Sequence, residues 1–255
     1  MQRIRQPRVA ELVASRLRDD ILTGRLAEGD VLPSQEALFA EFGVSPPAVR
    51  EAIHILESDG LISVRRGNVG GAVVHLPSAE RTAQMISMVL QTRAATPGDV
   101  SEALLHLEPI CAGLCAARAD RMTEVVPYLR AAIDAQSEQF DTLARYVPNA
   151  RRFHEELVSR CGNEPMILLI GALELIWSAH ESAVWSDEHH PDDPMNPTTM
   201  RAALRDHHRL LDAIADGNTA RAQRLAAAHL AAARRNTLAA GADKTIEAKL
   251  ISNRD

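Results

Sequence analysis

The stretch from Leu32 to Val74 reads LPSQEALFAEFGVSPPAVREAIHILESDGLISVRRGNVGGAVV, and it decides the fold of the first third of the chain. Gly43 can end one helix in the left-handed conformation, while Ser45 followed by Pro46 has the form of a helix start. Beyond the second helix, two short apolar runs flank a glycine-rich, arginine-bearing turn at residues 65–71. The pattern predicts a helix-turn-helix followed by a β-hairpin wing.

The second predicted helix has two distinct faces. Apolar side chains recur at helical spacing on one of them, at Val49, Ala52, Ile53 and Leu56. The other face carries Pro46, Arg50 and His54. We therefore expect the first face to pack in a core, which leaves Arg50 exposed near the start of the helix.

The order of these motifs resembles the winged-helix domain of GntR-family bacterial transcription factors. The resemblance rests on LPSQ, then FGVSPPAVREAIHILESDGLI, then RRGNVGG, and it covers about the first third of the chain. It implies a domain that binds a double-stranded DNA operator. The alternative is a small helical domain whose hairpin contacts another protein.

The resemblance also implies that the N-terminal end of the second helix enters the major groove, with the wing beside it. Arg50 is then the candidate for a guanine contact, and the alternative is a solvated arginine or an ion pair with Glu51 or Glu57. The wing arginines would reach phosphates or the minor groove. The full set of candidate DNA-binding residues is Ser34, Gln35, Ser45, Pro46, Pro47, Arg50, Arg65, Arg66, Asn68 and Gly70.

Two positions depart from the family pattern. Family members usually have one arginine in an LPxxR motif and another after the capping residue, where this chain has Glu36 and Pro46. Residues 1–77 hold nine arginines, no lysine and ten acidic residues, so attraction to DNA has to come from a local arrangement of arginines. The operator sequence does not follow from the resemblance.

The whole chain has the composition of a soluble globular protein with two domains. Of its 255 residues, 46% are hydrophobic and 24% are charged, and the net charge is −6. No signal peptide is evident, and the most apolar run, residues 166–177, is too short to cross a bilayer. Neither zinc-ribbon nor disulfide-framework spacing relates Cys111, Cys115 and Cys161. These features predict a cytoplasmic protein that has buried thiols and no membrane partner.

Beyond the wing, the periodicity is helical throughout. We expect helices at residues 79–95, 96–119, 123–137, 140–160, 165–184, 198–216 and 219–239. Pro148 either kinks the fourth of these or marks its start. The expected fold is mainly α, with a winged helix-turn-helix domain at 1–77, an all-helical bundle at 78–240 and a flexible tail at 241–255.

This second part of the chain resembles the FCD effector domain of FadR-type GntR regulators. The matching pieces are HLEPICAGLCAARA, RFHEELVSRCGNEPM and DHHRLLDAIADGNTARAQRLAAAHL, in that order behind the wing. The resemblance implies an all-helical domain that binds a small-molecule effector and forms a homodimer.

FCD domains of this kind often bind a divalent metal through one aspartate and three histidines. The resemblance assigns His154, His207 and His229 to this role, and Zn²⁺, Ni²⁺ or Mn²⁺ would suit such a site. The aspartate position is Ala150 here, so we expect weaker binding. Each histidine taken alone would more often be a surface or core residue.

The resemblance also concerns the effector. Many relatives carry an arginine four residues before the glutamate of the LEP motif, and it pairs with a carboxylate effector. Here these two positions are Leu104 and Glu108. We therefore expect a less acidic or more apolar effector, contacted by His106 or Arg152.

Together these features predict a ligand-responsive transcription factor of a metabolic operon. It would be a repressor that binds a palindromic operator as a homodimer and is released by its effector. The alternative from another class is a metal-dependent hydrolase that uses the three-histidine site with Glu155 as its base. No nucleophile motif or oxyanion arrangement accompanies that site in the sequence.

Overall fold

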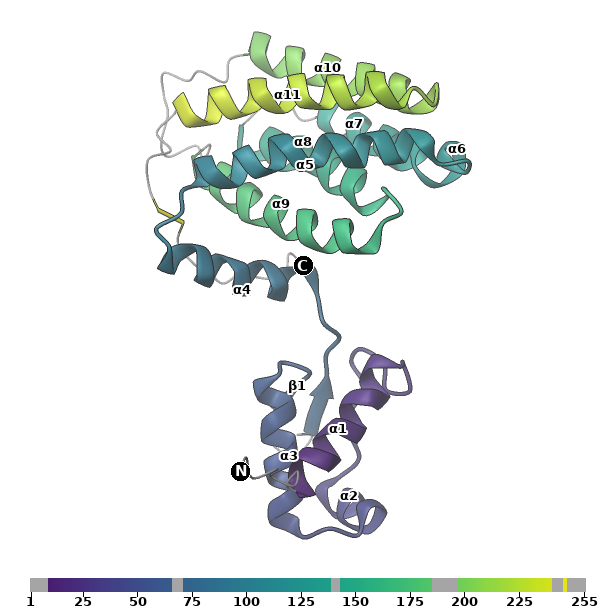
Figure 1. Ribbon diagram of the computed structural model, residues 1–255, viewed down its shortest axis with the longest axis vertical. Coiled ribbons are helices and arrows are strands. Elements are labelled where there is room, and N and C mark those ends of the chain that lie inside the picture. Colours follow the sequence, from purple (N-terminus) through teal and green to yellow (C-terminus); the bar gives the residue numbers. More distant parts are fainter. Residues whose placement is uncertain (1–8, 66–70, 139–142, 185–196, 240–244, 247–255) are drawn as a thin grey trace, which may run out of the picture. The chain divides into compact units, whose positions relative to one another are not determined.

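The computed structural model describes residues 9–65, 71–138, 143–184, 197–239 and 245–246 (Figure 1). The chain divides into two compact units, Met1–Ser78 and Ala79–Asp255, and each has its own hydrophobic core. This division falls one residue beyond the boundary expected at residue 77.

The N-terminal unit is a small helical domain with a two-stranded sheet. Its helices are α1 (Val9–Leu22), α2 (Gln35–Phe42) and α3 (Pro46–Ser58), and its strands are β1 (Ile62–Arg65) and β2 (Gly71–Val74). The strands pair antiparallel, with Ile62 opposite Val74, and an isolated bridge joins Val31 to Val73. The apolar faces of α1 and α3 pack against each other and form most of the core.

The turn between α2 and α3 forms where the sequence predicts it. Gly43 ends α2 with φ +63°, and the Ser34 hydroxyl caps the start of α2 by accepting from the Ala37 amide at 3.2 Å. Ser45 holds the N-cap position of α3, but its side chain makes no capping hydrogen bond. The two prolines that follow have no amide hydrogen, and the next amide, of Ala48, donates to the Ser45 carbonyl oxygen at 3.0 Å.

The C-terminal unit is all helical in the part that the structure describes. Its helices are α4 (Ala79–Thr92), α5 (Pro97–Ala117), α6 (Arg121–Glu124), α7 (Val126–Ser137), α8 (Leu143–Ser159), α9 (Glu164–Val184), α10 (Pro197–Ala215) and α11 (Thr219–Ala239). The single helix expected at 123–137 is divided, because Pro127 at the start of α7 cannot donate to the preceding turn. Pro148 lies inside α8 and does not mark its start.

Helix α5 is the centre of this bundle and packs against α8, α9, α10 and α11 (Figure 1). Its approach to α11 is close at Gly113, where an added Cβ would lie 2.5 Å from the Gln223 side-chain nitrogen. A capping box between Thr96 and Asp99 fixes its start. Among the described residues α5 alone is long and apolar enough to span a bilayer, but 56% of that stretch is buried within the protein, as in a core helix.

One residue of the expected flexible tail is ordered against the bundle. The Ile246 amide donates to the Ala95 carbonyl oxygen at 3.0 Å, and its side chain is 6% exposed within the core. Within the tail expected at 241–255, the Ile246 side chain therefore packs in the core, where its apolar surface is removed from water. Residues 241–244 and 247–255 lie outside the described residues.

Candidate functional site

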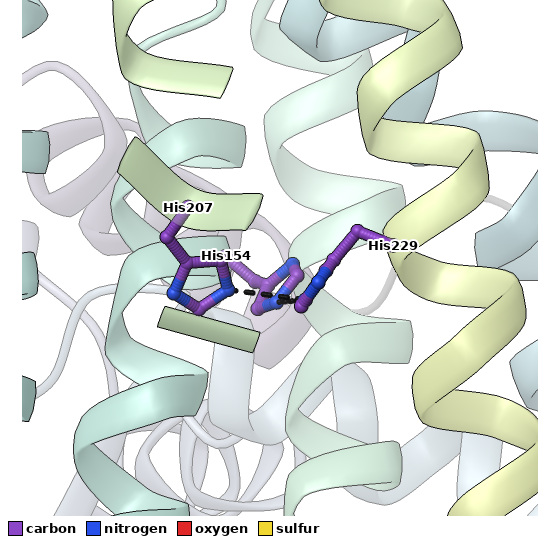
Figure 2. Close-up of side chains that lie close together, drawn as sticks. All are labelled: His154, His207 and His229. Carbon is purple, nitrogen blue, oxygen red and sulfur yellow. Dashed lines mark hydrogen bonds between the residues drawn. The ribbon is translucent and has the colours of Figure 1, made fainter. Parts of the chain in front are cut away.

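Three buried imidazoles meet in the core of the C-terminal unit. His154 lies on α8, His207 on α10 and His229 on α11, so three separate helices bring them together (Figure 2). The Nε2 atom of His229 lies 3.1 Å from that of His207 and 3.3 Å from that of His154. One ligand atom from each histidine lies within 4.8 Å of the others.

A chain of hydrogen bonds assigns the tautomer of His207. The Tyr146 hydroxyl donates to the Met200 carbonyl oxygen at 2.8 Å and accepts from the Gln136 amide nitrogen at 2.9 Å. The Gln136 side-chain oxygen therefore faces His207 Nδ1, at 2.8 Å, and must accept its proton. Because neutral imidazole carries one proton, Nε2 of His207 keeps a free lone pair that points at the cluster.

His154 is held in the same way by a buried carboxylate. Its Nδ1 donates to Glu108 Oε1 at 2.5 Å, and both side chains are enclosed. Burial lowers the pKa of His154 to about 4, although the Glu108 charge acts in the opposite direction. Burial by itself would raise the pKa of Glu108, but the His154 contact holds it below its usual range. The pair is therefore a carboxylate and a neutral imidazole, whose Nε2 lone pair also faces the cluster.

His229 completes the cluster but is poorly satisfied without a further partner. Its buried Nδ1 has no hydrogen-bond partner among the described residues, and Asp206 Oδ2 lies 3.9 Å away. Nε2 of His229 can donate one proton toward the other two rings, but this leaves Nδ1 with neither a proton nor a donor. A cation at the Nε2 atoms would instead let Nδ1 carry the proton toward Asp206.

These features fit a metal ion. In a tetrahedral zinc site, bonds of about 2.0–2.1 Å place neighbouring nitrogens roughly 3.3 Å apart, which is close to the two spacings seen here. Metal-bound histidines almost always direct their second nitrogen at a carboxylate or carbonyl group. In this cluster Glu108, Gln136 and Asp206 occupy those positions. Burial also lowers the pKa of His207 well below its usual value, so this imidazole is in its neutral form at neutral pH.

A cavity of about 100 Å³ opens beside the three histidines, and its walls come mostly from α8, α10 and α11. Ala150 lies in this wall, one turn from His154, so the absent aspartate leaves space next to the cluster. Much of the remaining wall is alanine, at Ala202, Ala203, Ala232 and Ala233. The polar groups include Arg151, Glu181, Asp206 and Asn236.

A buried charge network, which the sequence did not predict, adjoins the cavity. The Arg151 guanidinium contacts Glu174, and its Nε lies 3.5 Å from Glu181 Oε2 and 3.4 Å from Ser178 Oγ. Glu181 also accepts a hydrogen bond from the Thr237 hydroxyl at 2.8 Å. Arg151 lies three residues before His154, so both side chains are on one face of α8. This spacing is the sequence feature from which an inward-facing Arg151 could have been predicted.

The four predicted effector residues do not gather in the cavity. His106 and Arg152 are exposed, and Leu104 is buried in the hydrophobic core. Glu108 reaches the site only through its hydrogen bond to His154. The inward-facing arginine is Arg151, since a shift of one residue turns a helical side chain by about 100°.

The predicted DNA-binding residues lie in the N-terminal unit, along α2, α3 and β1. Arg50 is exposed on α3, opposite the buried Val49, Ala52 and Leu56. The other exposed members that the structure describes are Ser34, Gln35, Ser45, Pro46, Pro47 and Arg65. Arg66, Asn68 and Gly70 lie outside the described residues.

A winged helix-turn-helix joined to a helical bundle with an internal cavity defines a class of protein, the ligand-responsive DNA-binding regulators. Comparison with known protein families supports the same class. Residues 9–73 match the gntR family of bacterial regulatory proteins, and residues 99–232, more than half of the chain, match the FCD domain. The chain belongs to the gntR family and carries an FCD domain.

Known relatives are similar over much of their length. The HTH-type transcriptional repressor NanR of Klebsiella aerogenes is 26% identical over 230 residues, which are 88% of this chain and 83% of the relative. NanR of Salmonella bongori is 29% identical over 175 residues, 67% of this chain and 64% of that protein. The solved structure of Streptococcus agalactiae GntR has a TM-score of 0.67 at 21% identity, covers 89% of this chain and 99% of its own, and shares the fold.

The protein is therefore a transcriptional regulator and not an enzyme. Its relatives are DNA-binding repressors, and the hydrolase alternative is not favoured. Its proposed base, Glu155, is not among the residues that line the cavity.

Proposed function

We propose that this regulator binds a palindromic operator as a homodimer and is released when a small effector enters the cavity over a metal-bearing histidine cluster. The observation that carries the proposal is the convergence of three Nε2 atoms beside a cavity, each ring with its Nδ1 directed at a polar side chain. Such a site suits a sensor, since it can hold both an ion and a small molecule.

On the DNA side, Arg50 reads a base edge from the start of α3. Arg65, Arg66, Asn68 and Gly70 contact phosphates or the minor groove, while Ser34 and Gln35 approach the DNA backbone from the start of α2. One such domain covers only a half-site. Two copies of the chain related by a twofold axis therefore match two half-sites about one helical turn apart. The operator lies on cytoplasmic DNA.

In the cavity, His154, His207 and His229 hold Zn²⁺, Ni²⁺ or Mn²⁺. Because these histidines lie on α8, α10 and α11, a bound ion would link the three helices, and a ligand that changes this contact would change how the bundle is arranged. The ion acts as part of a binding site, and no chemical step is required of it.

Selection of bound duplexes from random DNA, followed by sedimentation of the complex, tests this proposal. The expected result is an inverted repeat that binds two protomers per duplex. An enriched site without twofold symmetry, or one protomer per duplex, would contradict the dimer.

A further inference from the structure

The cavity has one guanidinium among its described lining residues, that of Arg151, and this group is already engaged. Arg151 contacts Glu174 and lies near Glu181, and all three side chains are buried. With Glu108 included, this part of the core holds three buried carboxylates and one buried guanidinium. A divalent ion at the histidines would balance this excess, but it would leave no free positive charge for an anionic ligand.

The acidic groups that line the cavity determine which polar groups of a ligand can bind there. Glu181 and Asp206 both line the cavity, and a carboxylate can accept hydrogen bonds but cannot donate them. They repel a ligand carboxylate and favour ligand hydroxyl groups, which can donate. A cationic ligand would suit these carboxylates but would be repelled by the metal ion beside them. An uncharged ligand that donates hydrogen bonds is favoured by the carboxylates and is not repelled by the metal ion.

The shape of the cavity points to the same class of ligand. Five alanines in the wall give room for a short carbon chain, and about 100 Å³ suits only a few non-hydrogen atoms beyond the polar contacts. The space beside Ala150 lies next to His154, so a ligand oxygen can approach the metal from this side.

We propose that the effector is a small, uncharged, hydroxylated molecule such as a short polyol, whose hydroxyl groups donate to Asp206 and Glu181 while one oxygen faces the histidine-bound metal. This inference rests on the proposed sensor function and adds the class of ligand. It also gives Arg151 a role, which is to hold Glu181 in place at the cavity wall and not to bind a ligand carboxylate.

Calorimetry with a matched pair of four-carbon ligands tests the proposal. Erythritol is uncharged, and erythronate carries one carboxylate on the same skeleton. Zn²⁺-loaded wild-type protein should bind erythritol at least tenfold more tightly than erythronate. Glu181→Gln and Asp206→Asn each remove one acidic charge from the wall, so each should shift this ratio about tenfold toward erythronate. Glu102→Gln, at an exposed position on α5 that is not among the residues lining the cavity, should leave it unchanged.

The metal content, the melting temperature and the affinity for operator DNA are measured on the same samples. Wild-type protein that keeps its metal and binds DNA, yet prefers erythronate or binds neither ligand, overturns the inference and leaves the proposed function standing. Protein that holds no metal or binds no operator contradicts the proposed function itself. Glu181→Gln and Asp206→Asn each measure the ratio of the two ligand affinities independently. If one variant has a folding defect, seen as a lowered melting temperature, the other still gives the result.

Discussion

At the scale of single residues, three side chains determine what the histidine cluster can bind. Glu108, Gln136 and Asp206 each face the Nδ1 atom of one ring. Two of these contacts fix the proton on Nδ1, so the Nε2 lone pairs of His154 and His207 point toward the same small region. His229 Nε2 lies 3.1 Å from His207 Nε2 and 3.3 Å from His154 Nε2, so a proton or a metal ion among the three rings is needed to offset the repulsion of their lone pairs.

We therefore predict that His207→Ala lowers the affinity for Zn²⁺ by about 100-fold or more, because it removes one ligand and opens the core around the other two. His208→Ala is the matched control, since this residue is next on α10 and exposed. Ala150→Asp should tighten binding, because it adds a carboxylate one turn from His154. Metal content after mild dialysis, measured by mass spectrometry, gives the answer. Equal occupancy in the His207 and His208 variants would mean that the histidines only pack the core.

The buried histidines also predict how the metal-free protein responds to acid. The pKa of His154 in the folded state is about 4, below the ordinary value of 6.5. As the pH falls through 6.5 the unfolded chain takes up a proton that the folded protein does not, so stability is lost from there down to about pH 4. Between pH 7.5 and 5, His154 alone should cost about 2 kcal/mol of unfolding free energy.

Urea unfolding of chelator-treated protein at these two pH values checks this expectation. His154→Gln is the control. Because it removes the imidazole that titrates, the unfolding free energy of this variant should depend less on pH. A wild-type protein that is equally stable at pH 5 and pH 7.5 would show that His154 is not buried in its neutral form.

At the scale of elements, α3 presents Arg50 because its opposite face is buried against α1. Arg50→Ala should reduce discrimination between the operator and a scrambled duplex by about 1–3 kcal/mol, the usual worth of a bidentate base contact. Arg16→Ala, at an exposed position on α1, is the control for the loss of one positive charge. Fluorescence anisotropy on both duplexes measures the ratio. An unchanged ratio for Arg50→Ala would mean that this arginine contacts phosphate or solvent and not a base edge.

The sequence predicted most elements because local signals mark them. Gly43, the Thr96 cap and helical periodicity each act within a few residues, so helix positions follow from short-range chemistry. The division of the expected helix at Pro127 and the burial of Ile246 depend on which parts of the fold pack against these residues. A local sequence pattern does not contain this information. The same reason explains Arg151, whose partner Glu174 is 23 residues away in sequence. The three histidines were found through the family resemblance, and their mutual approach required the structure.

At the scale of the whole molecule, the chain joins a DNA-binding unit to a ligand-binding unit through residues 76–78. The Leu76 amide donates to Glu28 Oε2 at 2.5 Å, and His75 Nδ1 lies 3.0 Å from Glu28 Oε1. The linker thus begins at a residue that is bonded to the N-terminal unit. A change within the bundle can be passed to the DNA-binding unit through this segment and α4, which follows it.

The central claim is that the cavity and the DNA-binding surface are coupled, and reciprocity tests it most directly. A cavity ligand, taken first as erythritol, is titrated into metal-loaded protein with and without saturating operator, and operator affinity is measured with and without the ligand. Coupling of about 1–3 kcal/mol predicts that each partner weakens the other by the same factor, between roughly 5-fold and 150-fold. Ligand affinity that saturating operator leaves unchanged would contradict the account.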